Sequence, residues 1–402
     1  MLILIIIPFC LKNRNGIILV TTTILKTSPI HLRGYKSLEK DRISTNQMII
    51  LGLFTFIGDM ALVYPALMIS GAKQDAWIAA LISIPLGLAS IKLLLCVAEL
   101  EPNKNIIELS LQILGKWAGT AVALFYLGFF LIAAATYIRE IEDFMCTQIY
   151  EKTPGGVIRF MAIFLLVYGV RLGLETLGRA AQLFFPLFAV FLIGLLLLLT
   201  PDVRMERLYP IMNTPVPDML HTLMYGVFYP FGELCVFLMI YPYAQKNSKT
   251  SRDIFIALII GALGLNLILF FSITVLGVYA SEHQFYAAYI LAQKINIANS
   301  LQRIEALMAT AWIISTYFKT AIYYYALTLG TAQLFKLKSH RPLIIPTGFL
   351  LFGMSQLIAK DIIFYVKEIP TYWVDWDFTC AFVLPLMLLI VYYFKKRQAA
   401  KG

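Results

Sequence analysis

The chain has 402 residues, of which 60% are hydrophobic and only 14% are charged, and its mean hydropathy is +0.78. A water-soluble protein is about 25% charged, so much of this surface must face lipid, and a soluble globular fold is excluded. The net charge of +10 is typical of a membrane protein with basic loops, and it requires no nucleic acid as a partner.

The hydrophobic residues gather into ten apolar segments that are long enough, or nearly so, to cross a bilayer as helices of about 20 residues. These segments lie near residues 47–70, 77–98, 119–144, 155–172, 180–200, 219–243, 254–280, 306–335, 342–359 and 376–394. They predict an all-α polytopic membrane protein with ten transmembrane helices over residues 42–402. We treat residues 1–41 as an N-terminal extension, or a mis-assigned start, and give them no role.

Lys and Arg are distributed unequally between the loops on the two sides of these segments. If the N-terminal flank lies inside, the inner loops carry more Lys and Arg than the outer loops, and the acidic residues lean the other way. Cytoplasmic loops are normally the basic ones. We therefore expect both termini to be cytoplasmic.

Ten segments divide into two sets of five, at about residues 47–200 and 219–394. A repeat of five helices must begin on the opposite face of the membrane, so the two halves would form an inverted repeat. Asp59 in the first segment then corresponds to Glu233 in the sixth. In inverted-repeat transporters the first helix of each half is broken near the midplane, where its free backbone groups form the binding site.

Both first helices carry sequences that favour such a break. "FIGDMALVYP" (56–65) contains Gly58 and Pro65, and "FYPFGE" (228–233) contains Pro230 and Gly232. Each glycine precedes a carboxylate, which costs roughly 2.5–3.5 kcal/mol within a bilayer unless water or protein groups satisfy it. We interpret these segments as a binding site, although Gly and Pro can also simply kink two packed helices.

A third charge, Lys319, lies near the middle of the eighth segment. It is too far from either end to reach water, so we expect it to face the bundle interior with Asp59 or Glu233 as its partner. Three other candidate contacts for a bound molecule lie on the same helix: Thr316, Thr320 and Tyr324. Four aromatic residues are further candidates, with packing as their alternative role: Phe130, Phe228, Tyr229 and Phe231.

The sequence lacks the motifs of several other chemistries. The five cysteines are scattered without a C-x-x-C pair, the histidines have no metal-ligand spacing, and no phosphate-binding loop is present. We therefore expect no metal, no cofactor and no enzymatic activity. The charged run "REIED" (139–143) suits a helix end in solvent better than a vestibule that attracts cations.

Several separated motifs resemble one family. These are "GAKQDAW" (71–77), "NKNIIELSLQILGKWAG" (103–119), "RLGLETLGRAAQ" (171–182), "FGELCVFLMIYPY" (231–243) and "LQRIEALMATAWI" (301–313). Over about residues 42–394 the chain resembles the spore-germination permeases, the B subunits of nutrient germinant receptors in the amino acid–polyamine–organocation superfamily.

The resemblance implies a LeuT-like fold of ten helices in a 5+5 inverted repeat with helices 1 and 6 broken, located in the spore inner membrane. It also implies a small germinant, a membrane-embedded A subunit and a lipoprotein C subunit as partners. The binding region of the family maps onto Gly58, Gly232, Glu233, Lys319 and Thr320. Asp59 departs from the small or apolar residue expected after the glycine, and this extra acid would favour an amine or a cationic amino acid.

Two classes of function share this pocket. One is a receptor subunit that binds a germinant and passes a conformational change to its partners. The other is a secondary transporter that moves an amino acid or amine with protons. Lys319 would place a fixed cation where related transporters hold sodium, which disfavours sodium coupling and leaves proton coupling open.

Overall fold

The computed structural model describes residues 42–294 and 305–400. The extension expected at residues 1–41 lies outside the described residues. The first half contains β1 (Ile43–Ser44), α2 (Thr45–Ile57), α3 (Met60–Ala72), α4 (Ala76–Ala98), α5 (Ile106–Leu114), α6 (Lys116–Phe144), α7 (Gly155–Leu172) and α8 (Leu174–Leu199).

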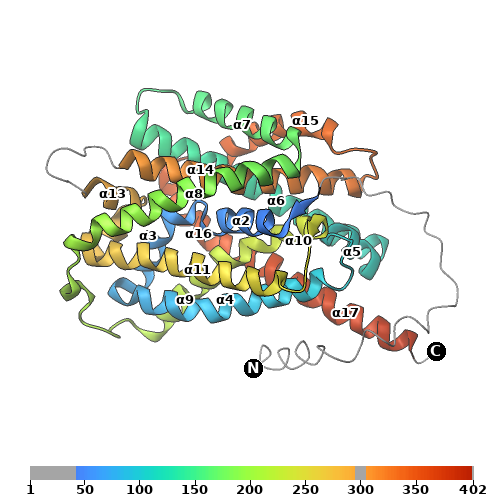
Figure 1. The fold of residues 1–402 in the computed structure, drawn as a ribbon, viewed down its shortest axis with the longest axis horizontal. Helices are drawn as coiled ribbons and strands as arrows, with labels where there is room; N and C mark the ends of the chain where they lie inside the picture. The colour runs from blue at the N-terminus through green and yellow to red at the C-terminus, as the bar shows by residue number, and fades with distance from the viewer. Residues whose placement is uncertain (1–41, 295–304, 401–402) are drawn as a thin grey trace. The chain divides into compact units, whose positions relative to one another are not determined.

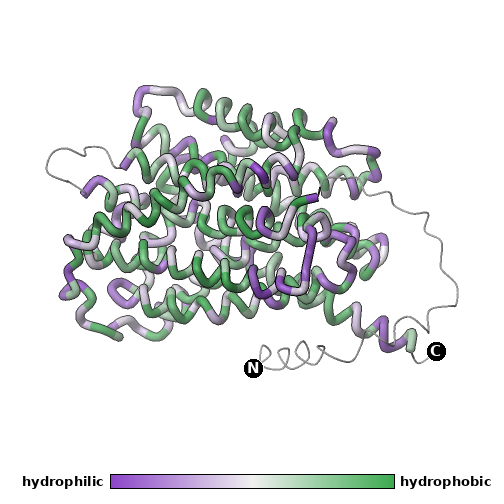
Figure 2. The backbone as a smooth tube through the Cα atoms, viewed as in Figure 1, coloured by the Kyte–Doolittle hydropathy of each residue, from purple (hydrophilic) through white to green (hydrophobic). Residues whose placement is uncertain are grey.

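The second half begins with α9 (Val216–Val227), α10 (Phe237–Ile240), β2 (Ala244–Gln245), α11 (Thr250–Phe271), α12 (Val278–His283) and α13 (Ala287–Lys294). It continues with α14 (Glu305–Leu334), α15 (Arg341–Leu357), α16 (Ile362–Phe378) and α17 (Leu384–Ala399). Figure 1 shows the long helices lying side by side, and Figure 2 shows polar residues gathered toward helix ends and connecting loops.

Helices occupy every apolar segment predicted from the sequence, which confirms an all-α, multi-pass membrane protein. Seven helical stretches among the described residues are long and apolar enough by themselves to cross a membrane. The last predicted segment was too short, because the helical run extends over Ile362–Ala399. Acidic residues such as Glu368 and Asp375 lower the local hydropathy there and hid the first half of that run from the sequence analysis.

Helix α14 forms the centre of the bundle and packs along α6, α2 and α8 (Figure 1). Four polar residues in its middle, Ser315, Thr316, Lys319 and Thr320, are fully buried. Protein, not lipid, surrounds this helix, so it can carry polar groups that a lipid-facing helix would exclude. This buried position explains why α14, with 30 residues, is not among the helical stretches that are apolar enough by themselves to cross a membrane.

A short β bridge joins the start of the first broken helix to the chain that follows the second. Ile43 pairs with Ala244 and Ser44 with Gln245, in parallel. The Thr45 hydroxyl also donates to the Gln245 carbonyl over 2.6 Å. The two segments are far apart in sequence, so this contact ties the beginning of the first broken helix to the end of the second.

Asp75 fastens the loop that connects the two halves. Its carboxylate accepts hydrogen bonds from the backbone N–H groups of Met212, Asn213 and Thr214 at 2.8–2.9 Å, and from the Thr214 hydroxyl at 2.9 Å. Asp75 is itself fully buried. One carboxylate therefore satisfies three backbone donors that would otherwise lack partners.

Replacing Asp75 with Ala should release this loop without unfolding the bundle. We expect the backbone amides of residues 212–214 to lose about 1–2 kcal/mol of protection, because each loses a charge-assisted hydrogen bond. Hydrogen exchange followed by mass spectrometry measures this loss. Asp202→Ala, on an exposed residue of the same connection, is the control, and equal protection in both variants would contradict the prediction.

Candidate functional site

The first predicted break is present between α2 and α3. Helix α2 ends at Ile57, with the Gly58 N–H still bonded to the Phe54 carbonyl at 2.8 Å, and a new helix begins at Met60. The Gly58 carbonyl, freed by the break, accepts a hydrogen bond from the Ser315 hydroxyl of α14 at 3.2 Å. The central helix thus satisfies the backbone group that the break exposes.

The second break is a change of helix type. After α9 the chain forms a π-helical turn, Phe228–Gly232, and then a 3₁₀ turn, Glu233–Val236. Pro230 has no backbone donor, so a regular α-helix cannot be completed through this region. The Tyr323 hydroxyl of α14 donates to the Glu233 carbonyl at 2.7 Å. Both breaks are therefore supported by side chains of the same helix.

Three buried side chains form the centre of the site, which we call the charge cluster: Lys319, Asp59 and Glu233. The Lys319 ammonium donates to Asp59 Oδ1 and to Glu233 Oε2. The side chains of Lys319 and Glu233 are fully buried and that of Asp59 is 5% exposed. We expected one of the two acids to pair with Lys319, and the structure shows that both do.

Glu233 is held by two further donors that the sequence did not single out. Its Oε1 accepts from the Tyr137 hydroxyl at 2.8 Å and from Trp373 Nε1 at 3.0 Å. The Tyr137 ring also lies 4.5 Å from the Lys319 ammonium, close enough for a cation–π interaction. Glu233 is therefore fixed in position by three helices, whereas the Asp59 side chain is hydrogen-bonded to Lys319 among the described residues.

Gly58 lies against Lys319 rather than against an open space. A Cβ atom at this position would stand 2.5 Å from Lys319 Cδ and 3.1 Å from the Phe54 carbonyl oxygen. The sequence suggested that the glycine leaves room for a bound molecule. In this structure, that room is filled by the stem of the lysine.

Two further carboxyl groups are fully buried near the cluster, and the sequence analysis did not name either as a site residue. Asp377 lies beside Gly232, and neither of its oxygens has a hydrogen-bond partner among the described residues. Glu140 accepts only a long bond from the Tyr365 hydroxyl, at 3.4 Å. Both acids stand inside predicted apolar segments, so the rule that identified Asp59 and Glu233 would have found them.

The interior around the charge cluster therefore holds one ammonium group, that of Lys319, and four carboxyl groups, those of Asp59, Glu233, Glu140 and Asp377. Buried charges of one sign are strongly unfavourable unless they are neutralised. The surplus acids must take up protons or be balanced by a cation that enters the site. The arrangement suits a positively charged group on a small molecule, and it also suits proton binding.

The prediction of a solvated helix end at residues 139–143 was wrong. Arg139, Glu140 and Glu142 are all buried. Arg159 of α7 binds Glu142 through two hydrogen bonds of 2.7 Å, and Arg139 pairs with Asp143 at 2.9 Å. The Arg159–Glu142 pair joins α7 to α6, and the Arg139–Asp143 pair lies within α6 itself. The packing of neighbouring helices, which the local sequence does not show, therefore covers the charged run.

The aromatic candidates differ in their surroundings. Phe130 packs on Tyr323, Phe228 on Phe378 and Phe231 on Phe56, with ring centroids 4.8–5.8 Å apart. The Tyr229 ring lies 6.5 Å from the Trp373 ring, and Trp373 donates a hydrogen bond to Glu233. Tyr229 therefore packs against a direct partner of the charge cluster.

The threonine and tyrosine candidates on α14 also differ from one another in their hydrogen-bond partners. The Thr320 hydroxyl donates to the Thr316 carbonyl at 2.7 Å, within its own helix. Tyr324 donates to the Ile344 carbonyl of α15, so the structure does not bring it to the charge cluster. The Thr316 hydroxyl has no hydrogen-bond partner among the described residues, although it is fully buried.

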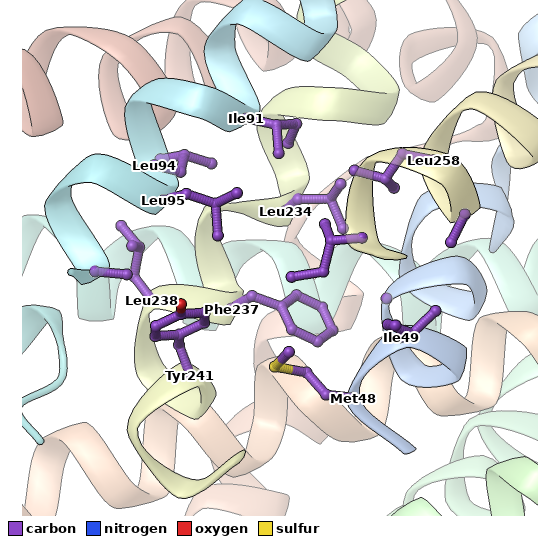
Figure 3. Close-up of a pocket in the computed structure, with 14 residues that line it drawn as sticks. Met48, Ile49, Ile91, Leu94, Leu95, Leu234, Phe237, Leu238, Tyr241 and Leu258 are labelled. Atoms are coloured by element: carbon purple, nitrogen blue, oxygen red, sulfur yellow. The ribbon is translucent and has the colours of Figure 1, made fainter. Parts of the chain in front are cut away.

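A separate cavity of about 70 Å³ lies between α2, α4, α10 and α11. Figure 3 shows its lining, in which Met48, Ile91, Leu234 and Phe237 present apolar side chains. It offers almost no polar atoms that could hold a charged group. No group of three or more His, Cys, Asp or Glu side chains among the described residues is arranged to hold a metal ion. The charge cluster is therefore the better candidate site.

Comparison with known proteins gives consistent matches over most of the chain. A family model described as "Spore germination protein" matches residues 42–363. Spore germination protein KB of Bacillus subtilis (strain 168) is 29% identical over 374 residues, which cover 91% of this chain and 99% of that protein. Spore germination protein GerLB of Bacillus cereus is 25% identical over 314 residues, covering 75% of this chain and 81% of that protein.

Among solved structures, the crystal structure of MhsT in complex with L-phenylalanine matches with a TM-score of 0.62 and 13% identity. The match covers 88% of this chain and 99% of that chain. At this level of identity the likeness concerns the fold alone. It confirms the LeuT-like, inverted-repeat architecture that the sequence predicted.

Proposed function

Because this chain belongs to the spore germination protein family, within the amino acid–polyamine–organocation superfamily, we propose that it is the B subunit of a nutrient germinant receptor. In this proposal a small germinant enters the bundle between the two broken helices. Its binding changes the packing of those helices, and partner subunits receive that change. The chain binds its ligand and does not transform it chemically.

The observation that carries the proposal is the charge cluster at the meeting point of both breaks. Lys319 holds Asp59 and Glu233 together, and these two acids follow the two glycines of the breaks directly. A ligand group that competes for either carboxylate would therefore change contacts on both broken helices at once. The excess of acids favours an amino acid or an amine, whose ammonium group supplies the missing positive charge.

A proton-coupled amino acid or amine transporter is the second candidate. Buried carboxyl groups without partners, above all Asp377, favour it, since a carboxyl that gains and loses a proton is the usual element of such coupling. Lys319 already occupies the centre of the site with a fixed positive charge, which argues against sodium as the coupled ion. The two candidates share one ligand site and differ in whether the ligand crosses the membrane.

The remaining assignments follow from the family. We place the protein in the spore inner membrane with both termini in the cytoplasm, as the distribution of Lys and Arg suggests. We propose a membrane-embedded A subunit and a lipoprotein C subunit as partners. The site residues we assign to the germinant are those around the charge cluster, and among the aromatic candidates we include Tyr229, which packs on Trp373.

Glu233→Gln should abolish the germination response while the protein remains folded in the membrane. Asp59 still neutralises Lys319 in this variant, but the second broken helix loses its bond to the ammonium. Spores that carry the receptor genes with this change would be exposed to amino acids and amines, and germination would be followed as loss of optical density. Glu206→Gln, at an exposed position, is the matched control.

A normal response in the Glu233→Gln spores would remove this acid from the site. Uptake of a radiolabelled ligand into vesicles that contain the purified chain separates the two candidate functions. Binding without accumulation supports the receptor. Accumulation that depends on a proton gradient supports the transporter.

A further inference from the structure

We infer that Glu140 and Thr316 form a subsite for a primary ammonium group, one helical turn along α14 from the charge cluster. This inference rests on the proposed function, since it takes the germinant proposed above and assigns its ammonium group to a subsite. The family resemblance does not include the two residues of this subsite. It is based on the register between α6 and α14 and on polar atoms that have no partner there.

The register follows from two contacts between the helices. Lys319 lies 4.5 Å from the Tyr137 ring, and the Trp312 ring lies 4.7 Å from the Phe144 ring. Between the two contacts the residue number rises by seven in α6, from Tyr137 to Phe144, and falls by seven in α14, from Lys319 to Trp312. The two helices are therefore antiparallel and keep the same register between these contacts. Residues at such spacing share one helix face. Glu140, three residues after Tyr137, is therefore level with Thr316, three residues before Lys319.

Both of these side chains are fully buried and incompletely bonded. Glu140 Oε1 and Thr316 Oγ1 have no hydrogen-bond partner among the described residues, and they do not bond each other. Trp312 Nε1 and the Tyr286 hydroxyl are unpartnered as well, and both rings pack on Phe144, one turn of α6 beyond Glu140. Buried polar atoms without partners are rare in proteins. Their presence at Glu140 and Thr316, and again one turn further on, indicates a place for a polar group that enters from outside the chain.

The charge at this place identifies the group. The nearest cations are already engaged: Arg139 binds Asp143 and the Ala359 carbonyl, and Lys319 binds the two acids of the charge cluster. Water could satisfy the hydrogen-bonding atoms of Glu140, but the carboxyl can be ionised at this depth only when a cation balances it. An ammonium supplies that charge together with donors for the Glu140 carboxylate and the Thr316 hydroxyl. Trp312 Nε1 is a donor and would suit an acceptor on the same ligand, such as a carboxylate.

The test uses the purified full-length chain in lipid nanodiscs and isothermal titration calorimetry. The probes are three sets: alanine with ethylamine and propionate, phenylalanine with phenethylamine and 3-phenylpropionate, and lysine with cadaverine. Glu140→Gln should weaken every ammonium-bearing ligand that binds the parent by on the order of 10- to 100-fold, as expected for a lost charge-assisted bond. Thr316→Val should weaken the same ligands by about 2- to 10-fold.

Two controls and a stability measurement complete the test. Glu206→Gln and Thr310→Val change exposed residues and should bind as the parent does. Without ligand, Glu140→Gln should melt at or above the parent temperature, because it removes a buried carboxyl group that has no ion-pair partner. If Glu140→Gln melts at a lower temperature than the parent, its lost affinity could come from lost stability, and the affinity of Thr316→Val then tests the subsite.

The outcomes separate the two proposals. Unchanged affinity in both site variants would mean that the place holds only water, and it would overturn this inference while the proposed function stands. If no probe binds the parent, the proposed ligand class falls and this inference falls with it. Equal weakening of amino acid and amine would show that the ammonium is recognised without help from the carboxylate.

Discussion

Replacing Lys319 with Met should destabilise the protein by about 3–5 kcal/mol, because two buried carboxylates lose the cation that they share. Among the described residues, neither acid forms an ion pair with any cation other than Lys319. Thermal unfolding of the purified chain in detergent measures the loss. Lys338→Met, at an exposed position on the loop after α14, is the control and should melt as the parent does.

The geometry also predicts how stability returns when the acids are removed. The sequence suggested that one acid alone would pair with Lys319, so that only one double variant would recover. Because the ammonium contacts both acids, Lys319→Met with either Glu233→Gln or Asp59→Asn should recover part of the loss. The triple variant should recover most of it. Losses that simply add across these variants would show that the charges do not interact.

Gly58→Leu should abolish ligand binding and lower stability by about 1–3 kcal/mol, the usual range for an overpacked interior. The added Cβ alone would collide with the stem of Lys319 and approach the Phe54 carbonyl. The lysine must then move, and its bonds to both acids move with it. Calorimetry on purified protein measures the binding, and thermal melts measure the stability.

Gly264→Ala on α11 provides a matched control for this change. Nothing lies within 4 Å of a Cβ atom at Gly264, so the substitution should be neutral or slightly stabilising in a helix. If Gly58→Leu were to leave affinity intact in a well-folded protein, the first break would not be part of the site. If it were to lower affinity without any loss of stability, the glycine would face the ligand and not Lys319.

The two broken helices are joined at two places, which offers a route by which ligand binding could be transmitted. The β bridge between residues 43–44 and 244–245 joins them at one end, and Lys319 joins them at the breaks. Two connections at different levels make the segments move together. A ligand that displaces Lys319 from one acid would therefore act on a coupled pair of helices, which suits a receptor that must pass a change to its partners.

The sequence by itself determined the class of protein, the position of nearly every helix and the presence of charges inside the membrane. Hydropathy and the Gly and Pro signals are local properties, and a bilayer imposes one strong rule on every segment that crosses it. The same rule identified Asp59, Glu233 and Lys319. It could also have identified Glu140, had the charged run on α6 not been taken for a helix end in solvent. Asp377 was missed because it stood at the edge of the last predicted segment, whose first half the sequence analysis did not include.

Only the tertiary structure decided which of these groups meet. The sharing of Lys319 between two acids, its stem against Gly58, and the alignment of Glu140 with Thr316 all depend on the rotation and register of helices far apart in the chain. The burial of residues 139–142 likewise depends on α7, whose Arg159 neutralises Glu142. Helical periodicity states which residues share a face, but the face that each helix turns to its neighbours is set by packing of the whole bundle.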